Sequence, residues 1–117
     1  METYNYLAAV TDDVRTWIND NRAAIADFDR DELEEYLRET LWIDDSVTGN
    51  ASGSYTYNSW TAEENLCHNW ELLAEACAEF GTDLGEAVKK GAEFCDVTIR
   101  CHLLPDAIAA ALDEMDN

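Results

Sequence analysis

The excess of acidic over basic side chains limits most strongly what this chain can fold into. The sequence has 26 Asp and Glu against 7 Lys and Arg, which gives a formal net charge of −19. Repulsion between so many like charges destabilises a compact state. A small domain needs a net charge of only about 2–8 to stay soluble. The remaining charge therefore calls for a functional explanation.

The apolar content is nevertheless that of a folded protein. Apolar residues make up 47% of the 117 residues, and the chain has four Trp, five Tyr and three Phe. A chain of this length buries roughly 60–70% of its unfolded surface, which is enough for a core without disulfides or metals. Intrinsic disorder is excluded by this composition, and we expect a single domain over residues 1–117.

Apolar residues recur at spacings of three and four along most of the chain, which predicts a mainly α fold. We expect a compact bundle of four to five helices. Pro105 should either kink the last helical segment or stand in the first turn of a new helix. The helices are expected at residues 3–19, 30–42, 61–80, from 82 through 99 as far as the interruption at Pro105, and 105–115, with a further short piece at 22–27 that could be helical.

Two of these helices carry signals for where they begin and end. Asp29 and Glu32 have the spacing of a capping box, as do Thr61 and Glu64, and Gly81 is placed to end the helix that Thr61 begins. The apolar stripe of this 61–80 helix is expected to bury Leu66, Trp70, Leu73, Cys77 and Phe80. By the same periodicity, Cys95 is expected to be a core residue of the following helix.

Residues 44–60 are rich in Gly, Ser and Asn, which is typical of turns. Val47-Thr48 and residues 54–57 could pair as a short hairpin. Tyr55, Tyr57 and Trp60 stand among small polar residues, a mixture that suits a recognition surface. Alternatively these aromatic side chains pack on the core and the loop only connects two helices.

The acidic residues are concentrated in a window without cations. Between Glu39 and Glu86 there are ten acidic residues and no Lys or Arg. Four glutamates in the 61–80 helix fall on the side opposite its apolar stripe. On one continuous helix the first spacing of seven residues is about 10.5 Å and each spacing of four is about 6 Å. These four residues are Glu64, Glu71, Glu75 and Glu79.

The 30–42 helix and its flanks add a second acidic patch, with nine acidic residues and two Arg between Asp27 and Asp45. Like charges four residues apart on a helix cost a few tenths of a kcal/mol per pair. One simple interpretation of both acidic faces is that they only solvate the protein. Another is adaptation to high salt, which fits poorly with four Cys and many aromatic residues.

The chain offers little that predicts catalysis or a cofactor. Cys67-His68 and Cys101-His102 could supply four zinc ligands, but neighbours on a helix point about 100° apart. Nearby carboxylates raise the pKa of a thiol, which disfavours a Cys nucleophile. Gly49 and Gly53 do not form a phosphate-binding loop. We therefore expect a protein that is not an enzyme, with no catalytic residues, metal or cofactor.

The sequence also indicates where the protein acts. No secretion signal or membrane span is visible, and all four Cys fall in expected helices and not in a disulfide framework. We therefore expect the protein to be cytoplasmic. Its charge disfavours direct binding to nucleic acid, because it has no basic patch, and to anionic membranes.

Three stretches resemble a family of small acidic proteins carried on conjugative elements and prophages of gut anaerobes. They are residues 45–56, Cys67-His68-Asn69 and residues 95–101. The resemblance covers most of residues 3–115 and carries over no catalytic residues. It implies a mobile-element setting, in which small acidic proteins include DNA mimics that block restriction or CRISPR nucleases.

Three functions follow as hypotheses. The first is a DNA-mimic inhibitor that occupies the nucleic-acid groove of a basic host protein. The second is an accessory or regulatory protein that binds its partner through the aromatic 49–60 loop. The third is a small Cys/His metal protein. The predicted partner-binding residues are Asp31, Glu35, Glu39, Asp44, Asp45, Tyr55, Tyr57, Glu64, Glu71, Glu75 and Glu79.

Overall fold

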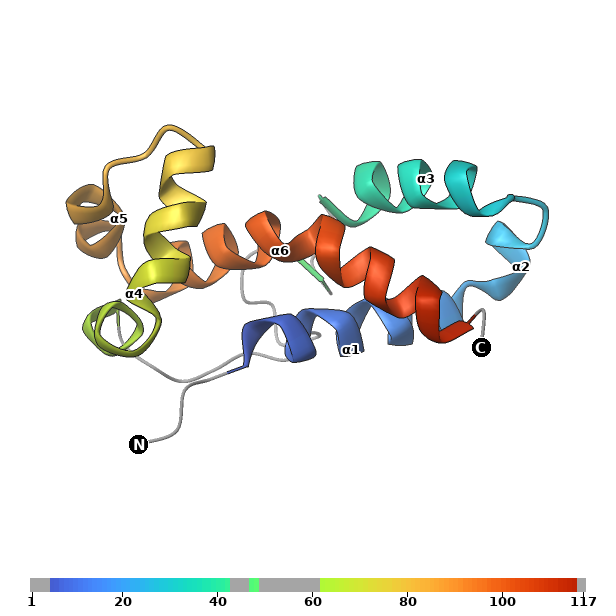
Figure 1. Ribbon diagram of the computed structural model, residues 1–117, viewed down its shortest axis with the longest axis horizontal. Coiled ribbons are helices and arrows are strands. Elements are labelled where there is room, and N and C mark those ends of the chain that lie inside the picture. Colours follow the sequence, from blue (N-terminus) through green and yellow to red (C-terminus); the bar gives the residue numbers. More distant parts are fainter. Residues whose placement is uncertain (1–4, 43–46, 49–61, 116–117) are drawn as a thin grey trace.

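The computed structural model describes residues 5–42, 47–48 and 62–115, except for the side chains of residues 62–68 and 92. These residues form six helices and no strand, which confirms the mainly α prediction (Figure 1). No helix in these ranges is long and apolar enough to cross a bilayer. The helices are α1 (Tyr6–Asp20), α2 (Arg22–Ile25), α3 (Arg30–Trp42), α4 (Ala62–Glu79), α5 (Leu84–Lys90) and α6 (Ala92–Met115).

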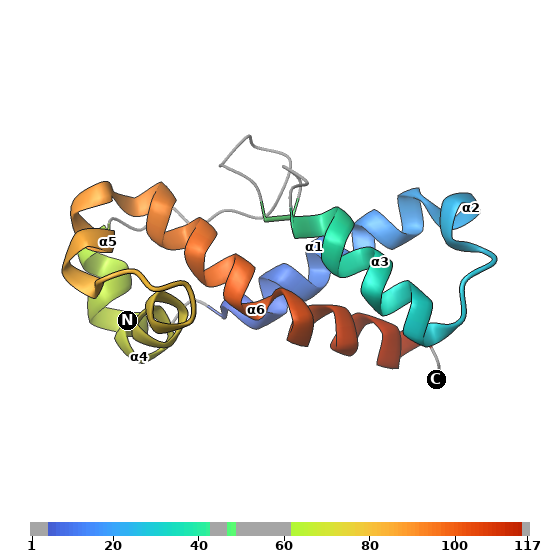
Figure 2. The same cartoon turned by 90° about the horizontal axis from the view of Figure 1, so that it is seen from above.

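Helix α6 is the axis of the molecule. It has 24 residues and contacts α1, α3, α4 and α5. Figures 1 and 2 show α4 and α5 packed at one end of α6, with α1, α2 and α3 along the rest of it. The fold is therefore elongated, with extents of 44 × 28 × 25 Å, and it has two hydrophobic cores that share α6.

The first core lies between α1, α3 and the C-terminal part of α6. Three leucines of α3, spaced by four residues, form one buried stripe that faces a matching stripe of α1. The predicted capping box begins α3: Asp29 Oδ1 accepts from the Glu32 amide at 2.9 Å, and Glu32 Oε1 accepts from the Asp29 amide at 3.5 Å. The two stripes are Leu33, Leu37 and Leu41 of α3, and Val10, Val14 and Ile18 of α1.

The second core lies between α4, α5 and the N-terminal part of α6. Cys77 and Cys95 are both buried in it, as their spacing predicted. Gly81 ends α4 with a φ of 67°, and the Thr82 amide donates to the Cys77 carbonyl at 2.8 Å. This bond and the left-handed glycine form a Schellman motif, so the prediction that Gly81 terminates this helix is confirmed.

The predicted apolar stripe of α4 is wrong at two positions. Leu73 and Cys77 are buried, but Trp70 is 55% exposed and Phe80 is 37% exposed. Asn69 has non-helical dihedrals (φ −134°, ψ 29°), so α4 is kinked there, and Trp70 is the first residue after the kink. Phe80 lies beyond the last residue of α4, where the helical spacing no longer applies.

The predicted break between the last helices is also wrong. The helix expected from residue 82 through 99 ends at Lys90, and Gly91, with a φ of 113°, separates α5 from α6. Helix α6 instead continues through Pro105 without a break. Pro105 is on the exposed side, while its neighbours Leu104 and Ile108 are packed into the first core. Burial of these neighbours holds the helix together across the hydrogen bond that proline lacks.

The first part of the predicted hairpin is not a strand. Val47 and Thr48 form a turn, and residues 49–61 lie outside the described part of the chain. The Thr48 hydroxyl donates to the carbonyl oxygens of Leu41 and Trp42, the latter at 2.6 Å. Val47 is fully buried in the first core. The two residues thus cover the C-terminal end of α3, whose last carbonyls need partners.

A buried polar network joins α1 to α6, and the sequence analysis did not single it out. The Arg100 side chain is 0% exposed; its Nη2 pairs with Asp13 and its Nε donates to the Val47 carbonyl at 2.8 Å. One turn away, the Tyr6 hydroxyl donates to Asp96 Oδ1 at 2.8 Å. Burial raises the pKa of Asp96 to about 6, although Tyr6 and Arg100 both lower it.

Candidate partner-binding surface

The α4 row consists of Glu71, Glu75 and Glu79, which all follow the kink at Asn69 and are all exposed. Their spacing of four residues places them along about 12 Å of one helix face. Within the described residues, no Lys or Arg forms an ion pair with them. A histidine lies beside them instead: His102 Nε2 is 3.8 Å from Glu75, and its Nδ1 is 3.5 Å from Glu79.

Glu64 was predicted as the fourth member of this row. Its backbone belongs to α4, but its side chain is outside the described part of the chain. The kink at Asn69 lies between Glu64 and Glu71, so the spacing expected for one straight helix is wrong. The row that the structure describes is therefore shorter, with three carboxylates and not four.

The α3 row consists of Asp31, Glu35 and Glu39, which are also exposed and also spaced by four. Here, however, cations are interspersed. Arg30 Nε lies 3.1 Å from Glu34, and Arg38 Nη2 lies 3.9 Å from the same carboxylate. Helix α3 thus carries two Arg among its acidic residues, although both of these ion pairs are with Glu34 and not with a member of the α3 row.

The two rows also differ in their relation to the helix dipole. Asp31 is in the first turn of α3, where the positive end of the dipole stabilises a carboxylate. Glu79 is the last residue of α4, and the last turn of that helix has no basic residue. A carboxylate there meets the negative end of the dipole. The α4 row is therefore placed where charge costs stability.

The distribution of cations accounts for this contrast. All seven Lys and Arg lie in the described ranges, and none belongs to α4. Arg15 pairs with Asp12 and Glu114, Lys89 lies 3.7 Å from Glu86, and Arg100 is buried. Every cation is thus placed on another helix, so that the α4 surface remains strongly negative.

The ends of α3 and α4 meet in an aromatic contact that the sequence analysis missed. The rings of Trp42 and Phe80 are 5.5 Å apart and meet edge to face at 65°. Trp42 is 45% exposed, so that both rings are on the surface. Beneath them is a groove of about 250 Å³, whose floor is formed by α6 residues that include Phe94, Val97 and Cys101. We call this hollow the Trp42–Phe80 groove.

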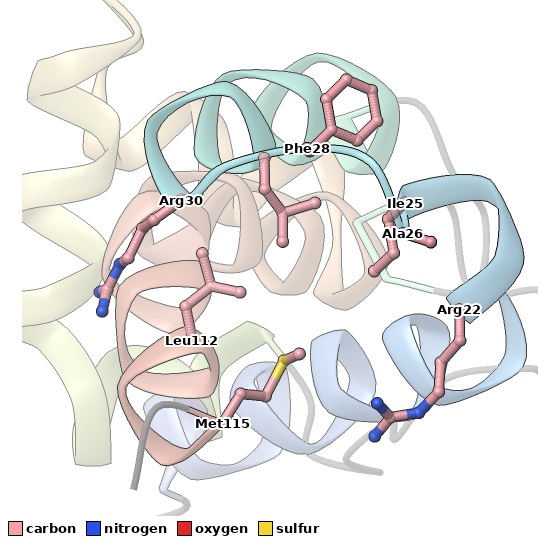
Figure 3. A pocket seen from close by; sticks show the side chains of 8 residues that line it. Arg22, Ile25, Ala26, Phe28, Arg30, Leu112 and Met115 are labelled. Atoms are coloured by element: carbon pink, nitrogen blue, oxygen red, sulfur yellow. The ribbon is translucent and has the colours of Figure 1, made fainter.

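A second hollow, of about 420 Å³, lies at the other end of the molecule (Figure 3). Ile25, Phe28 and Leu112 line it, and Arg22 and Arg30 lie at opposite edges. Arg30 is engaged by carboxylates of α3 and α6, whereas Arg22 donates to Asn19 Oδ1 at 2.7 Å. This hollow therefore does not continue the acidic surface.

The Cys–His pairs show no chemical site within the described residues. No group of three or more His, Cys, Asp or Glu is placed there to hold a metal ion. Burial raises the pKa of the Cys101 thiol to about 11, so that it is protonated and weakly nucleophilic at neutral pH. The side chains of Cys67 and His68 are outside the described part of the chain.

Four further predicted binding residues, Asp44, Asp45, Tyr55 and Tyr57, also lie outside the described residues, as does Trp60. In comparisons with known proteins, no family model, curated protein or solved structure matches this chain. The candidate partner-binding surface therefore consists of the two acidic rows and the Trp42–Phe80 groove at the ends of their helices.

Proposed function

We propose that this chain is a DNA-mimic inhibitor, which binds a basic, nucleic-acid-binding protein through its acidic surface and occupies the groove meant for nucleic acid. The observation that carries the proposal is the α4 row, Glu71, Glu75 and Glu79, which is exposed and has no Lys or Arg partner within the described residues. We propose that the α3 row, on a separate helix, also takes part in binding.

The placement of the charges on α4 has an energetic cost that supports the proposal. Glutamates at spacings of four repel one another by a few tenths of a kcal/mol per pair, and Glu79 adds an unfavourable interaction with the helix dipole. The same chain balances its other acidic helix with Arg30 and Arg38. Charge that reduces stability on a helix without any cation is expected where a basic partner recovers the lost energy on binding.

The spacing of the α4 carboxylates also supports the proposal. Successive carboxylates of the α4 row are about 6 Å apart along the helix axis. A DNA strand has one phosphate per ~3.4 Å of its axis, so each step of the row corresponds to about two phosphates. A rigid helix can thus present charge at part of a phosphate array, and long-range attraction would make association fast and dependent on salt.

The class of partner follows from the resemblance to proteins of mobile elements. In that setting, the basic grooves that an acidic decoy would block belong to restriction or CRISPR nucleases. The proposal therefore names a host defence nuclease as the target and assigns this chain no catalysis of its own.

A pull-down from host lysate at low and moderate salt tests the proposal. The triple variant Glu71→Lys, Glu75→Lys, Glu79→Lys is compared with Asp20→Lys, Asp27→Lys, Asp106→Lys, which changes the net charge equally at exposed sites away from the row. We expect the wild type and the control variant to retain a nucleic-acid-binding protein, which DNA displaces, and the α4 variant to lose it.

Retention of that partner by the α4 variant would show that the α4 row is not the interface. A partner that resists salt, has no relation to nucleic acid and is lost on replacing Tyr55 and Tyr57 by Ala would overturn the decoy. It would support the accessory protein with the aromatic loop instead.

A further inference from the structure

We propose that the Trp42–Phe80 groove is an anchor site, which takes one apolar side chain that the partner carries between Lys or Arg residues. This inference depends on the proposed function, because it names the chemistry of the segment that the acidic surface would bind. It adds a contact that a pure DNA mimic lacks, since phosphates offer nothing to an apolar groove.

The first observation that supports an anchor site is the exposure of the two aromatic side chains. In the described part of the chain, Trp42 and Phe80 are two of the five large apolar side chains that are exposed, and their rings are in contact. Tryptophan is among the residues that most often dominate binding energy when a partner covers it. The groove volume, about 250 Å³, is below the ~300–1,000 Å³ of pockets for drug-sized ligands, which suits a single side chain.

The second observation is that the negative charge beside the groove complements a basic partner segment. Glu79 directly precedes Phe80, and Glu39 is one helical turn before Trp42, so that each acidic row ends at one wall of the groove. Phe94, which lines the groove, has Lys90 Nζ 4.6 Å from the centre of its ring. A partner segment that fits both the apolar groove and the acidic rows beside it has an apolar centre and cationic flanks.

The acidic rows and the Trp42–Phe80 groove would act on different rate constants of binding. Exposed carboxylates accelerate association and are screened by salt, whereas an apolar side chain that fills a groove slows dissociation. The anchor therefore predicts a dissociation rate that changes little between low and moderate salt, while the association rate falls.

The test uses a bead library of random synthetic 12-residue peptides, screened against the full chain at low salt. We expect selected peptides to combine Lys or Arg with one aromatic or leucine residue. For the best peptide, Trp42→Ala should weaken binding roughly 10- to 30-fold, as expected for an interface hot spot. Trp70→Ala is the matched control, because Trp70 is also exposed, at 55% against 45% for Trp42, but does not line the groove. It should change affinity by less than about threefold.

Phe80→Ala provides a second variant, and circular dichroism confirms that each variant is folded. The carbonyl of Trp42 that Thr48 contacts belongs to the backbone and is kept in Trp42→Ala. Selected peptides that need only cations, and bind Trp42→Ala as well as wild type, would overturn the anchor and leave the acidic-surface proposal standing. Peptides with an apolar residue and no cations would overturn the acidic-surface proposal and the basic occupant with it.

Discussion

Helices α3 and α4 carry the same pattern of three exposed carboxylates at spacings of four, yet their charges are treated differently. Arg30 and Arg38 lie among the acids of α3, whose row begins at the favourable end of the helix dipole. The row of α4 has no cation on its helix and ends at the unfavourable end. The comparison shows that the placement of the seven cations, more than the number of acids, distinguishes the row of α4 from the row of α3.

The comparison extends to the two cores on which these helices lie. Helix α3 packs on the first core, with α1 and α2, and four of the five arginines belong to these three helices. Helix α4 packs on the second core with α5. The two halves share α6, and Arg100 and Asp96 of α6 connect it to α1.

The largest effect is expected from removing the polar network that connects α6 to α1. Arg100→Met would leave Asp13 and Asp96 buried without their cation, and removing one partner of a buried ion pair costs about 3–5 kcal/mol. Urea unfolding measures this loss of stability. Arg38→Met, at an exposed pair, should cost less than about 1 kcal/mol. A loss below about 1 kcal/mol for Arg100→Met would show that the two cores hold together without this network.

The second core can be weakened separately at the turn between α5 and α6. Gly91 has a φ of 113°, which residues with a Cβ rarely adopt, so that Gly91→Ala should cost about 1–3 kcal/mol. The added Cβ meets no atom within 4 Å, and the cost is therefore in the backbone alone. Amide exchange should accelerate in α4 and α5 more than in α3. Uniform acceleration would mean that the two cores unfold as one unit. Gly85→Ala, inside α5, is the control.

The connection itself should respond to pH through Asp96. Because burial raises the pKa of this carboxyl from 3.8 to about 6, the folded state binds the proton more tightly than the unfolded state. Stability therefore rises as pH falls from 7 toward 4 and is lost as pH rises through about 6. The effect is on the order of 2 kcal/mol. Subtracting the unfolding profile of Asp96→Asn isolates it, and identical profiles would contradict the assignment.

The smallest effect should come from the charge rows themselves. Replacing Glu71, Glu75 and Glu79 by Gln removes their repulsion and should raise stability by about 0.5–1 kcal/mol at low salt. The same change at Asp31, Glu35 and Glu39 should gain less, because Asp31 favours its helix end. Thermal unfolding with and without salt checks both, since salt should abolish the gain. An equal gain in both helices would remove the distinction between them.

Local signals in the sequence were sufficient wherever short-range contacts decide the outcome. The bounds of α3, its capping box and the end of α4 at Gly81 agree with prediction, because each depends on residues within one turn of each other. The buried Cys77 and Cys95 also agree, since helical spacing alone placed them inward.

The errors occurred where distant contacts compete with local preference. Pro105 is a local signal for a break, but packing of its neighbours keeps α6 continuous. Trp70 has the spacing of a core residue but is exposed, directly after the kink at Asn69. Among the predicted binding residues, the structure describes two rows on separate helices, while Asp44, Asp45, Tyr55, Tyr57 and the side chain of Glu64 lie outside the described ranges.

The sequence by itself determined that the protein is mainly helical, strongly acidic and without cations between Glu39 and Glu86, because composition and spacing are properties of the chain alone. Only the tertiary structure decided that Trp42 and Phe80 meet above a groove at the ends of two acidic rows. It likewise decided that an arginine at position 100 is buried against Asp13. Residues so far apart in the chain come together through the packing of α6, and no local pattern records which partner they find.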